Sequence, residues 1–351
     1  MNQQIEYEIR DGVFIITLKN PPVNALGNKL RQALYDAISI VKAEAKIRAV
    51  ILIGHGRCFC GGADIKEFGV NSLAPTLPEV ITAIESLSKP VVVALHGFAF
   101  GGGLELSLGC NYRIGTTSVQ LGLPEVNIGL IPGAGGTQRL PRLIGSDRAL
   151  NMILNGKPVS AEKALSYGIL DTLFEEHSLL DNAILFALAR AEEGGPYPIV
   201  REKKPIIQNT KIFKTMRKKI EGRARGLIAP WCCIESIENI YLLSFDQGMS
   251  RERELFLRCQ ESEQSSAQQY IFFAEREARK LPNLIQDKFQ SSINSAAVIG
   301  CGTMGAGIAI CFACNNIPVK IIDNNANVLK KGLKNIAKTF EKLVKRNEIT
   351  K

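Results

Sequence analysis

Short apolar runs alternate with helical patterns along the first 115 residues of the chain. "RAVILIG" and "PVVVALHG" are nearly continuous apolar runs, and "TLPEVITAIESL" between them carries apolar residues at helical spacing. Continuous apolar strands separated by helices are typical of a mainly parallel sheet that helices cover on both faces. At the start, "YEIR" and "VFIITLK" flank "DG", which predicts a β-hairpin. The expected fold class is therefore α/β.

The pattern divides the chain into three expected domains. Helical patterns dominate beyond residue 142, and "EEGGPYPIVREKKP", rich in Gly, Pro and charge, predicts that a first domain ends near residue 195. A helical and basic connector is expected over residues 196–290, with "QSSAQQYIFFAEREARKL" as its last clear helix. The remaining residues, 291–351, form the third expected domain.

This third domain carries a glycine-rich fingerprint. The strand "AAVIG" runs into Gly300, Gly302 and Gly305, a helix follows, and a second strand, "VKIID", ends on Asp323. This order predicts a dinucleotide site of the Rossmann type. In such a site the glycines let the backbone approach the pyrophosphate and let the helix pack close to the strand. Asp323 would bind the ribose hydroxyls and favour NAD over NADP. The alternative is a glycine-rich turn that binds nothing.

Composition and charge limit the possible partners. With 46% hydrophobic and 22% charged residues, and without a long uninterrupted apolar run, the chain is typical of a globular protein that does not span a membrane. Much of the net charge of +9 lies in residues 201–225. Nucleic acid is one candidate partner, but this segment has a single aromatic residue, Phe213, so we favour a solvated basic face or a phosphate-bearing small ligand.

The nine cysteines are scattered and odd in number, which favours free thiols. Cys311 and Cys314 form a CxxC motif without a second Cys or His pair nearby, so we expect no metal site.

Two glutamates stand in apolar or glycine-rich surroundings. Glu105 lies within "GGGLELSLGC" and Glu125 within "LPEVNIGLIPGAGG". A buried carboxylate is costly unless it has partners or a chemical role, although a lone Glu on a short helix is more often solvated or paired. "GRCFCGGADIKEF" places Ala63 on a glycine-rich loop before an expected helix, where backbone N–H groups are available to a ligand.

Four segments together resemble the crotonase (enoyl-CoA hydratase/isomerase) superfamily over residues 5–190. They are "NPPVNAL", "GGADIKEF", "HGFAFGGGLELSLGCNYRIG" and "LPEVNIGLIPGAGGTQRLPRLIG". The resemblance implies a first domain with the ββα spiral of that superfamily. With the connector and the glycine fingerprint, the chain is similar to the bifunctional enzymes of fatty-acid β-oxidation, which join such a domain to a 3-hydroxyacyl-CoA dehydrogenase. That similarity implies a peroxisomal location.

The resemblance also implies a role for each site residue. The N–H groups of Ala63 and Gly102 correspond to the oxyanion hole that holds the thioester oxygen. Glu105 corresponds to the carboxylate that activates water for addition at C3, and Glu125 to the acid that delivers a proton to C2. The expected reaction is hydration of trans-2-enoyl-CoA to 3-hydroxyacyl-CoA without a cofactor, with Δ3,Δ2-enoyl-CoA isomerisation at the same site.

The dehydrogenase activity of the family is not expected from these 351 residues. Residues 295–351 hold a single βαβ unit and no His, so we expect weak or no NAD binding and no oxidation of 3-hydroxyacyl-CoA. The last residues, "RNEITK", do not match a peroxisomal targeting tripeptide. We expect a monomer, because the connector helices would cover the surface that relatives use to form trimers. The alternative functions are a non-catalytic acyl-CoA-binding protein and, from the charge alone, a nucleic-acid-binding protein.

Overall fold

Most of the chain is described by the computed structural model, which covers residues 4–67, 73–206, 211–222, 224–278, 293–345 and 349. Contacts divide the chain into a first unit, residues 1–279, and a second unit, residues 280–351. Residues 196–278, expected to be a connector, pack with the preceding residues in the first unit. Among the described helices, none is long and apolar enough to cross a membrane.

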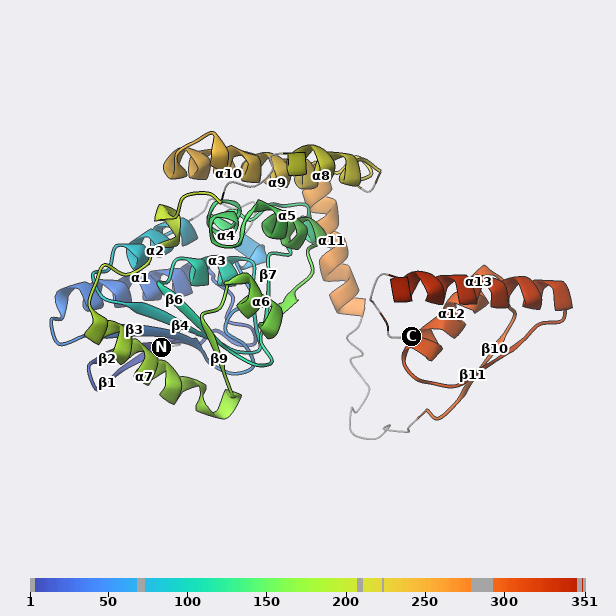
Figure 1. The fold of residues 1–351 in the computed structure, drawn as a ribbon, viewed down its shortest axis with the longest axis horizontal. Coiled ribbons are helices and arrows are strands. Elements are labelled where there is room, and N and C mark those ends of the chain that lie inside the picture. Colours follow the sequence, from blue (N-terminus) through green and yellow to red (C-terminus); the bar gives the residue numbers. More distant parts are fainter. Residues whose placement is uncertain are drawn as a thin grey trace. The chain divides into compact units, whose positions relative to one another are not determined.

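A six-stranded sheet lies at the centre of the first unit (Figure 1). Its strands, in spatial order, are β1 (Ile5–Arg10), β2 (Val13–Leu18), β3 (Ala49–Gly54), β4 (Val91–Leu95), β6 (Tyr112–Thr116) and β9 (Thr172–Phe174). The first two strands form the expected hairpin, paired antiparallel from Ile5↔Leu18 to Arg10↔Val13, and every other neighbouring pair is parallel. The expectation of a mainly parallel sheet is confirmed.

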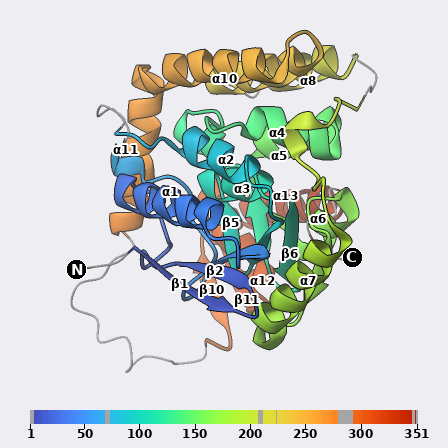
Figure 2. The ribbon, with the colours of Figure 1, turned by 90° about the vertical axis from the view of Figure 1, so that its left-hand side faces the viewer.

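Helices cover both faces of this sheet (Figures 1 and 2). Side chains alternate between the faces along β2, because successive residues of a strand point to opposite sides. Phe14 and Ile16 enter the main core, whereas Val13 and Ile15 pack in a second cluster with α7 (Leu179–Glu193). The main core lies under α1 (Asn28–Ala43) and α2 (Leu77–Glu85).

A smaller sheet and short helices carry the loops in which the site residues were expected. In this sheet the central strand β7 (Gln120–Gly122) pairs with β5 (Phe98–Phe100) on one side and with β8 (Val159–Ser160) on the other. The helical elements around it are the 3-10 turns η1 (Ile65–Glu67) and η2 (Glu125–Ile128), and the helices α3 (Gly102–Leu108), α4 (Gly136–Ile144), α5 (Ser146–Asn155) and α6 (Ala161–Tyr167). The remaining 3-10 turns of the first unit are η3 (Glu176–Ser178), η4 (Val200–Glu202) and η5 (Asn239–Tyr241).

Four further helices lie in the described part of the first unit. They are α8 (Lys211–Glu221), α9 (Ala229–Glu238), α10 (Phe245–Gln260) and α11 (Glu263–Ala278). Figures 1 and 2 show α8 and α10 in a layer beyond α4 and α5, on the side away from the large sheet. Both α9 and α10 contact α4, and α11 contacts η2. The helices expected in the connector therefore pack directly on the elements that follow Glu125 in the chain.

The second unit has the expected order of strand, helix and strand. Its two parallel strands, β10 (Ala296–Ile299) and β11 (Val319–Ile322), are joined by α12 (Thr303–Cys314), and α13 (Ala326–Lys345) follows. Val298 is buried, but Ile299 is 87% exposed and Ile322 is 56% exposed. Within this unit, the described residues thus leave apolar side chains at the carboxyl ends of both strands in contact with solvent.

Candidate active site

Glu105 lies in the first turn of α3 and is buried, with 3% of its surface exposed. Its Oε1 accepts hydrogen bonds from the N–H groups of Ala134, at 2.7 Å, and Gly136, at 2.8 Å. Burial raises the pKa of Glu105, while these two bonds and the Arg139 guanidinium act in the opposite direction. Its Oε2 accepts no hydrogen bond from the part of the chain that the structure describes. This oxygen is therefore available to a substrate or a water molecule.

Glu125 begins the 3-10 turn η2, and the fold brings it close to Glu105. A Cβ placed on Gly101 would lie 3.0 Å from Oε1 of Glu125, and the carbonyl oxygen of Gly101 accepts the N–H of Glu105 at 2.9 Å. The Oε2 atom of Glu125 is buried without a partner among the described residues. Burial, and then the charges of Glu105 and Glu252, raise the pKa of Glu125 well above its ordinary value. The environment thus favours the protonated form of Glu125.

The N–H groups of Ala63 and Gly102 are neighbours beside these acids. A Cβ placed on Gly102 would lie 3.1 Å from the nitrogen of Ala63. Ala63 is held by a parallel bridge to Leu26, and Gly102 is the first residue of α3, where backbone N–H groups have no partner inside the helix. Within the described chain, neither N–H donates a hydrogen bond. Two adjacent free donors can bind one oxygen atom.

Two glycines provide the space that the carboxylates occupy. Gly101 adopts φ +51°, which side chains rarely tolerate, and connects β5 to α3. A Cβ on Gly136 would lie 2.8 Å from Oε1 of Glu105. In the same way, a Cβ on Gly101 would lie 3.0 Å from Oε1 of Glu125. The glycine-rich segments that stood out in the sequence therefore line the two acids directly.

A third buried carboxylate, Glu252 of α10, was missed by sequence reasoning. It is fully buried and accepts hydrogen bonds from the N–H groups of Gly135, at 2.6 Å, and Thr137, at 3.0 Å. Burial, followed by the charge of Glu105, raises its pKa to about 8. A signal existed in the sequence, because the apolar stripe of this helix, with Leu255, Phe256 and Cys259 buried, includes position 252 at helical spacing.

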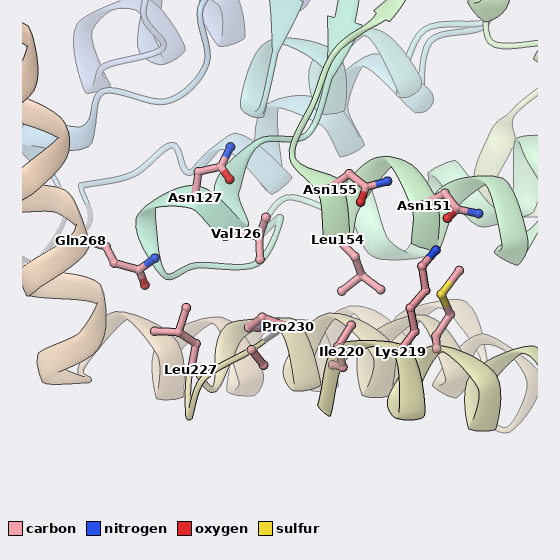
Figure 3. A pocket seen from close by; sticks show the side chains of 12 residues that line it. Val126, Asn127, Asn151, Leu154, Asn155, Lys219, Ile220, Leu227, Pro230 and Gln268 are labelled. Carbon is pink, nitrogen blue, oxygen red and sulfur yellow. The ribbon is translucent and has the colours of Figure 1, made fainter. Parts of the chain in front are cut away.

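A pocket of about 290 Å³ lies beside η2, next to Glu125 in the chain (Figure 3). Figure 3 shows Val126 and Leu154 on one side of it, with Ile220 and Leu227 on the other. The walls therefore come from η2 and α5 together with the segment that contains α8. No group of His, Cys, Asp or Glu side chains among the described residues could hold a metal ion.

Comparison with known proteins decides the family. A model of the Enoyl-CoA hydratase/isomerase family matches residues 8–221, which is more than half of the chain. The chain belongs to this family. This enoyl-CoA hydratase/isomerase family member has the expected α/β fold class, and the resemblance inferred from residues 5–190 is confirmed.

Relatives extend the similarity along nearly the whole chain. This family member is 38% identical to the peroxisomal bifunctional enzyme of Danio rerio over 352 aligned residues, or 97% of this chain and 48% of that protein. It is 38% identical to the human peroxisomal bifunctional enzyme, over 95% of this chain and 47% of that protein. The chain thus spans about half the length of these curated relatives. The crystal structure of carnitinyl-CoA hydratase from Mycobacterium avium has a TM-score of 0.60 at 26% identity, covering 78% of this chain and 97% of that one.

The second unit matches the NAD-binding domain of 3-hydroxyacyl-CoA dehydrogenase over residues 295–351. A Cβ at Gly305 would lie 1.8 Å from the carbonyl oxygen of Gly300, so only glycine lets α12 approach the turn. Gly302 precedes α12 and has open space around it. Asp323 accepts the N–H groups of Cys301, at 2.7 Å, and Asn325, at 2.8 Å, and these bonds lower its pKa. The residues fit the pyrophosphate and ribose of NAD.

Proposed function

We propose that the chain hydrates trans-2-enoyl-CoA to 3-hydroxyacyl-CoA and isomerises Δ3-enoyl-CoA to Δ2-enoyl-CoA at the same site. The observation that carries this proposal is the pairing of two buried acids, Glu105 and Glu125, beside two adjacent N–H groups without partners. Hydration of a conjugated thioester needs a base for water, an acid for C2 and a site for the enolate oxygen. These four groups can supply all three.

The different surroundings of the two acids support a division of roles. The N–H groups on Oε1 of Glu105 stabilise its ionised form, as a general base requires, whereas the buried Oε2 of Glu125 has no described donor. In this mechanism, Glu105 takes a proton from water while the oxygen forms a bond to C3, and Glu125 gives its proton to C2. Burial raises the pKa of both acids, and that of Glu125 well above its ordinary value, which suits Glu125 to the role of proton donor.

The N–H groups of Ala63 and Gly102 would bind the thioester oxygen while charge moves onto it. Each such donor contributes about 3 to 4 kcal/mol to stabilising the transition state in comparable sites. In isomerisation, a proton leaves C2 to give a dienolate and a proton is then delivered to C4, so charge develops on the same thioester oxygen without addition of water. Glu125 alone can carry that proton.

The first experiment incubates the full chain with crotonyl-CoA and follows the absorbance of the conjugated thioester. We expect the absorbance to fall at a rate proportional to protein concentration, with 3-hydroxybutyryl-CoA as the product. A chain that binds crotonyl-CoA in equilibrium dialysis but leaves the absorbance unchanged would instead be the non-catalytic acyl-CoA-binding protein. Heat-treated chain provides the control.

The names of the relatives support a proposal about the substrates and the location of this reaction. We propose that the substrates are fatty acyl-CoA thioesters of peroxisomal β-oxidation, because the zebrafish and human relatives are peroxisomal bifunctional enzymes. The packing of α8 to α11 within the first unit, where α9 and α10 contact α4 and α11 contacts η2, supports action as a monomer.

NAD is proposed to bind weakly, if at all, to these 351 residues. Gly300, Gly302 and Gly305 would hold the pyrophosphate and Asp323 a ribose, where bound NAD would accept hydride. The second unit has only two described strands, and residues 295–351 contain no His to take the hydroxyl proton. We expect no NADH above a heat-treated control when chain, NAD and 3-hydroxybutyryl-CoA are mixed. NADH fluorescence that rises with chain concentration would contradict this.

A further inference from the structure

The turn formed by residues 134–137 lies between two carboxylates that come from distant parts of the chain. The N–H groups of Ala134 and Gly136 donate to Glu105, and those of Gly135 and Thr137 donate to Glu252. The four successive donors thus alternate between the two acids. Because these donors form the N-terminal end of α4, each carboxylate also lies where the helix dipole stabilises negative charge.

Glu252 is further fixed by a buried polar network. The Thr137 hydroxyl contacts both Oε2 of Glu252 and, at 2.6 Å, the hydroxyl of Ser236 on α9. The Gln138 amide donates to the carbonyl oxygen of Ser236 at 3.0 Å. Each member of this network is buried, so a displaced Glu252 would leave donors of the turn without an acceptor. The network thus holds, through Glu252, the two N–H groups of the turn that do not donate to Glu105.

Titratable and charged groups on several elements act on Glu252 or on the acids near it. The charge of Glu105 on α3 raises the pKa of Glu252, and the charge of Glu252 in turn raises the pKa values of Glu125 on η2 and of Cys233 on α9. The Arg139 guanidinium on α4 attracts Glu105 and donates to the carbonyl oxygen of Ala134 at 3.2 Å. Glu252 therefore belongs to the same electrostatic cluster as the two acids of the proposed mechanism.

We propose that Glu252 is a positioning residue for hydration, which holds the 134–137 turn so that the turn's other N–H groups fix and orient Glu105. This inference rests on the proposed function. With Oε1 of Glu105 bound to Ala134 and Gly136, its Oε2 is the oxygen that meets the water. If the turn shifts, the Glu105 carboxylate loses its two N–H donors and no longer points its Oε2 at the water, so hydration slows. Isomerisation adds no water and depends on Glu125, so it should be affected much less.

The test compares Glu252→Gln with the matched control Glu254→Gln, a mainly exposed acid on the same helix. Glutamine keeps the shape of Glu252 but offers one carbonyl oxygen in place of two acceptors. In the full chain, we expect kcat for crotonyl-CoA hydration to fall about 10- to 100-fold, as expected for a misdirected base. KM and the rate of 3-enoyl-CoA isomerisation should stay within about threefold, and Glu254→Gln should change neither reaction.

Glu252→Asp provides a second variant, which keeps the charge but shortens the reach, and it should lower the ratio of hydration to isomerisation in the same direction. An equal loss of both reactions, an unchanged ratio, or failure of both variants to fold would overturn the proposal in favour of a purely structural role. A wild-type chain that does not hydrate crotonyl-CoA would instead overturn the proposed function itself.

Discussion

Replacing Glu105 by Gln is expected to slow hydration of crotonyl-CoA by a factor of about 10² to 10⁴, the usual effect of losing a positioned acid or base. The amide keeps the shape of the side chain but cannot take a proton from water. Conversion of 3-enoyl-CoA to 2-enoyl-CoA should remain measurable, because it needs no water. Both rates are measured on the same preparation, one from the loss and the other from the gain of the conjugated thioester absorbance.

The control for this variant is substrate binding. The proposed oxyanion donors are backbone N–H groups of Ala63 and Gly102, so Glu105→Gln should still bind CoA thioesters in equilibrium dialysis. If isomerisation is lost as completely as hydration while binding is retained, the division of roles between the two acids is wrong.

Replacing Glu125 by Gln is expected to slow hydration and isomerisation together, each by a factor of about 10² or more. Each reaction passes through an enolate of the thioester and moves a proton at C2, which is gained in hydration and lost in isomerisation. Gln can neither give nor take that proton. The same two absorbance assays measure this variant, and it too should retain CoA thioester binding. Normal hydration by Glu125→Gln would contradict the assignment.

The raised pKa of Glu125 also gives the wild-type chain a pH dependence. The acid must be protonated to give its proton to C2, and burial keeps it protonated above the range of an ordinary Glu. The hydration rate should therefore fall as pH rises through the pKa of Glu125. It should also fall as pH decreases through the pKa of Glu105, because a protonated base cannot activate water.

The first sheet shows which parts of a fold are local enough to predict. The hairpin of β1 and β2 follows from "DG" between two apolar runs, and Asp11 and Gly12 adopt positive φ, as that turn requires. The strands β3 and β4 were recognisable because both faces of them are buried. In the second unit, the glycine fingerprint similarly predicted the strand, turn and helix, because Gly300 adopts a positive φ at the turn and Gly305 lets α12 approach it.

The candidate site was only partly predictable, for a physical reason. Glu105 and Glu125 could be named because glycine-rich segments and a family resemblance surround them in the sequence. Glu252 is flanked by Arg251 and Arg253, so its neighbourhood resembles that of a solvated, charged helix. What distinguishes it is a set of hydrogen bonds to the 134–137 turn, which exists only after α10 has packed against α4.

The two glycines beside the carboxylates also affect how sequence change would act on this protein. At Gly101 and Gly136, the volume of one methyl group would overlap the space next to Glu125 and Glu105, at 3.0 and 2.8 Å from their oxygens. A change to alanine alters no charge and removes no hydrogen-bonding side chain. We therefore expect alanine at either position to impair the proposed reaction while every acid is retained, so that an intact pair of glutamates in a related sequence would not by itself identify a working enzyme.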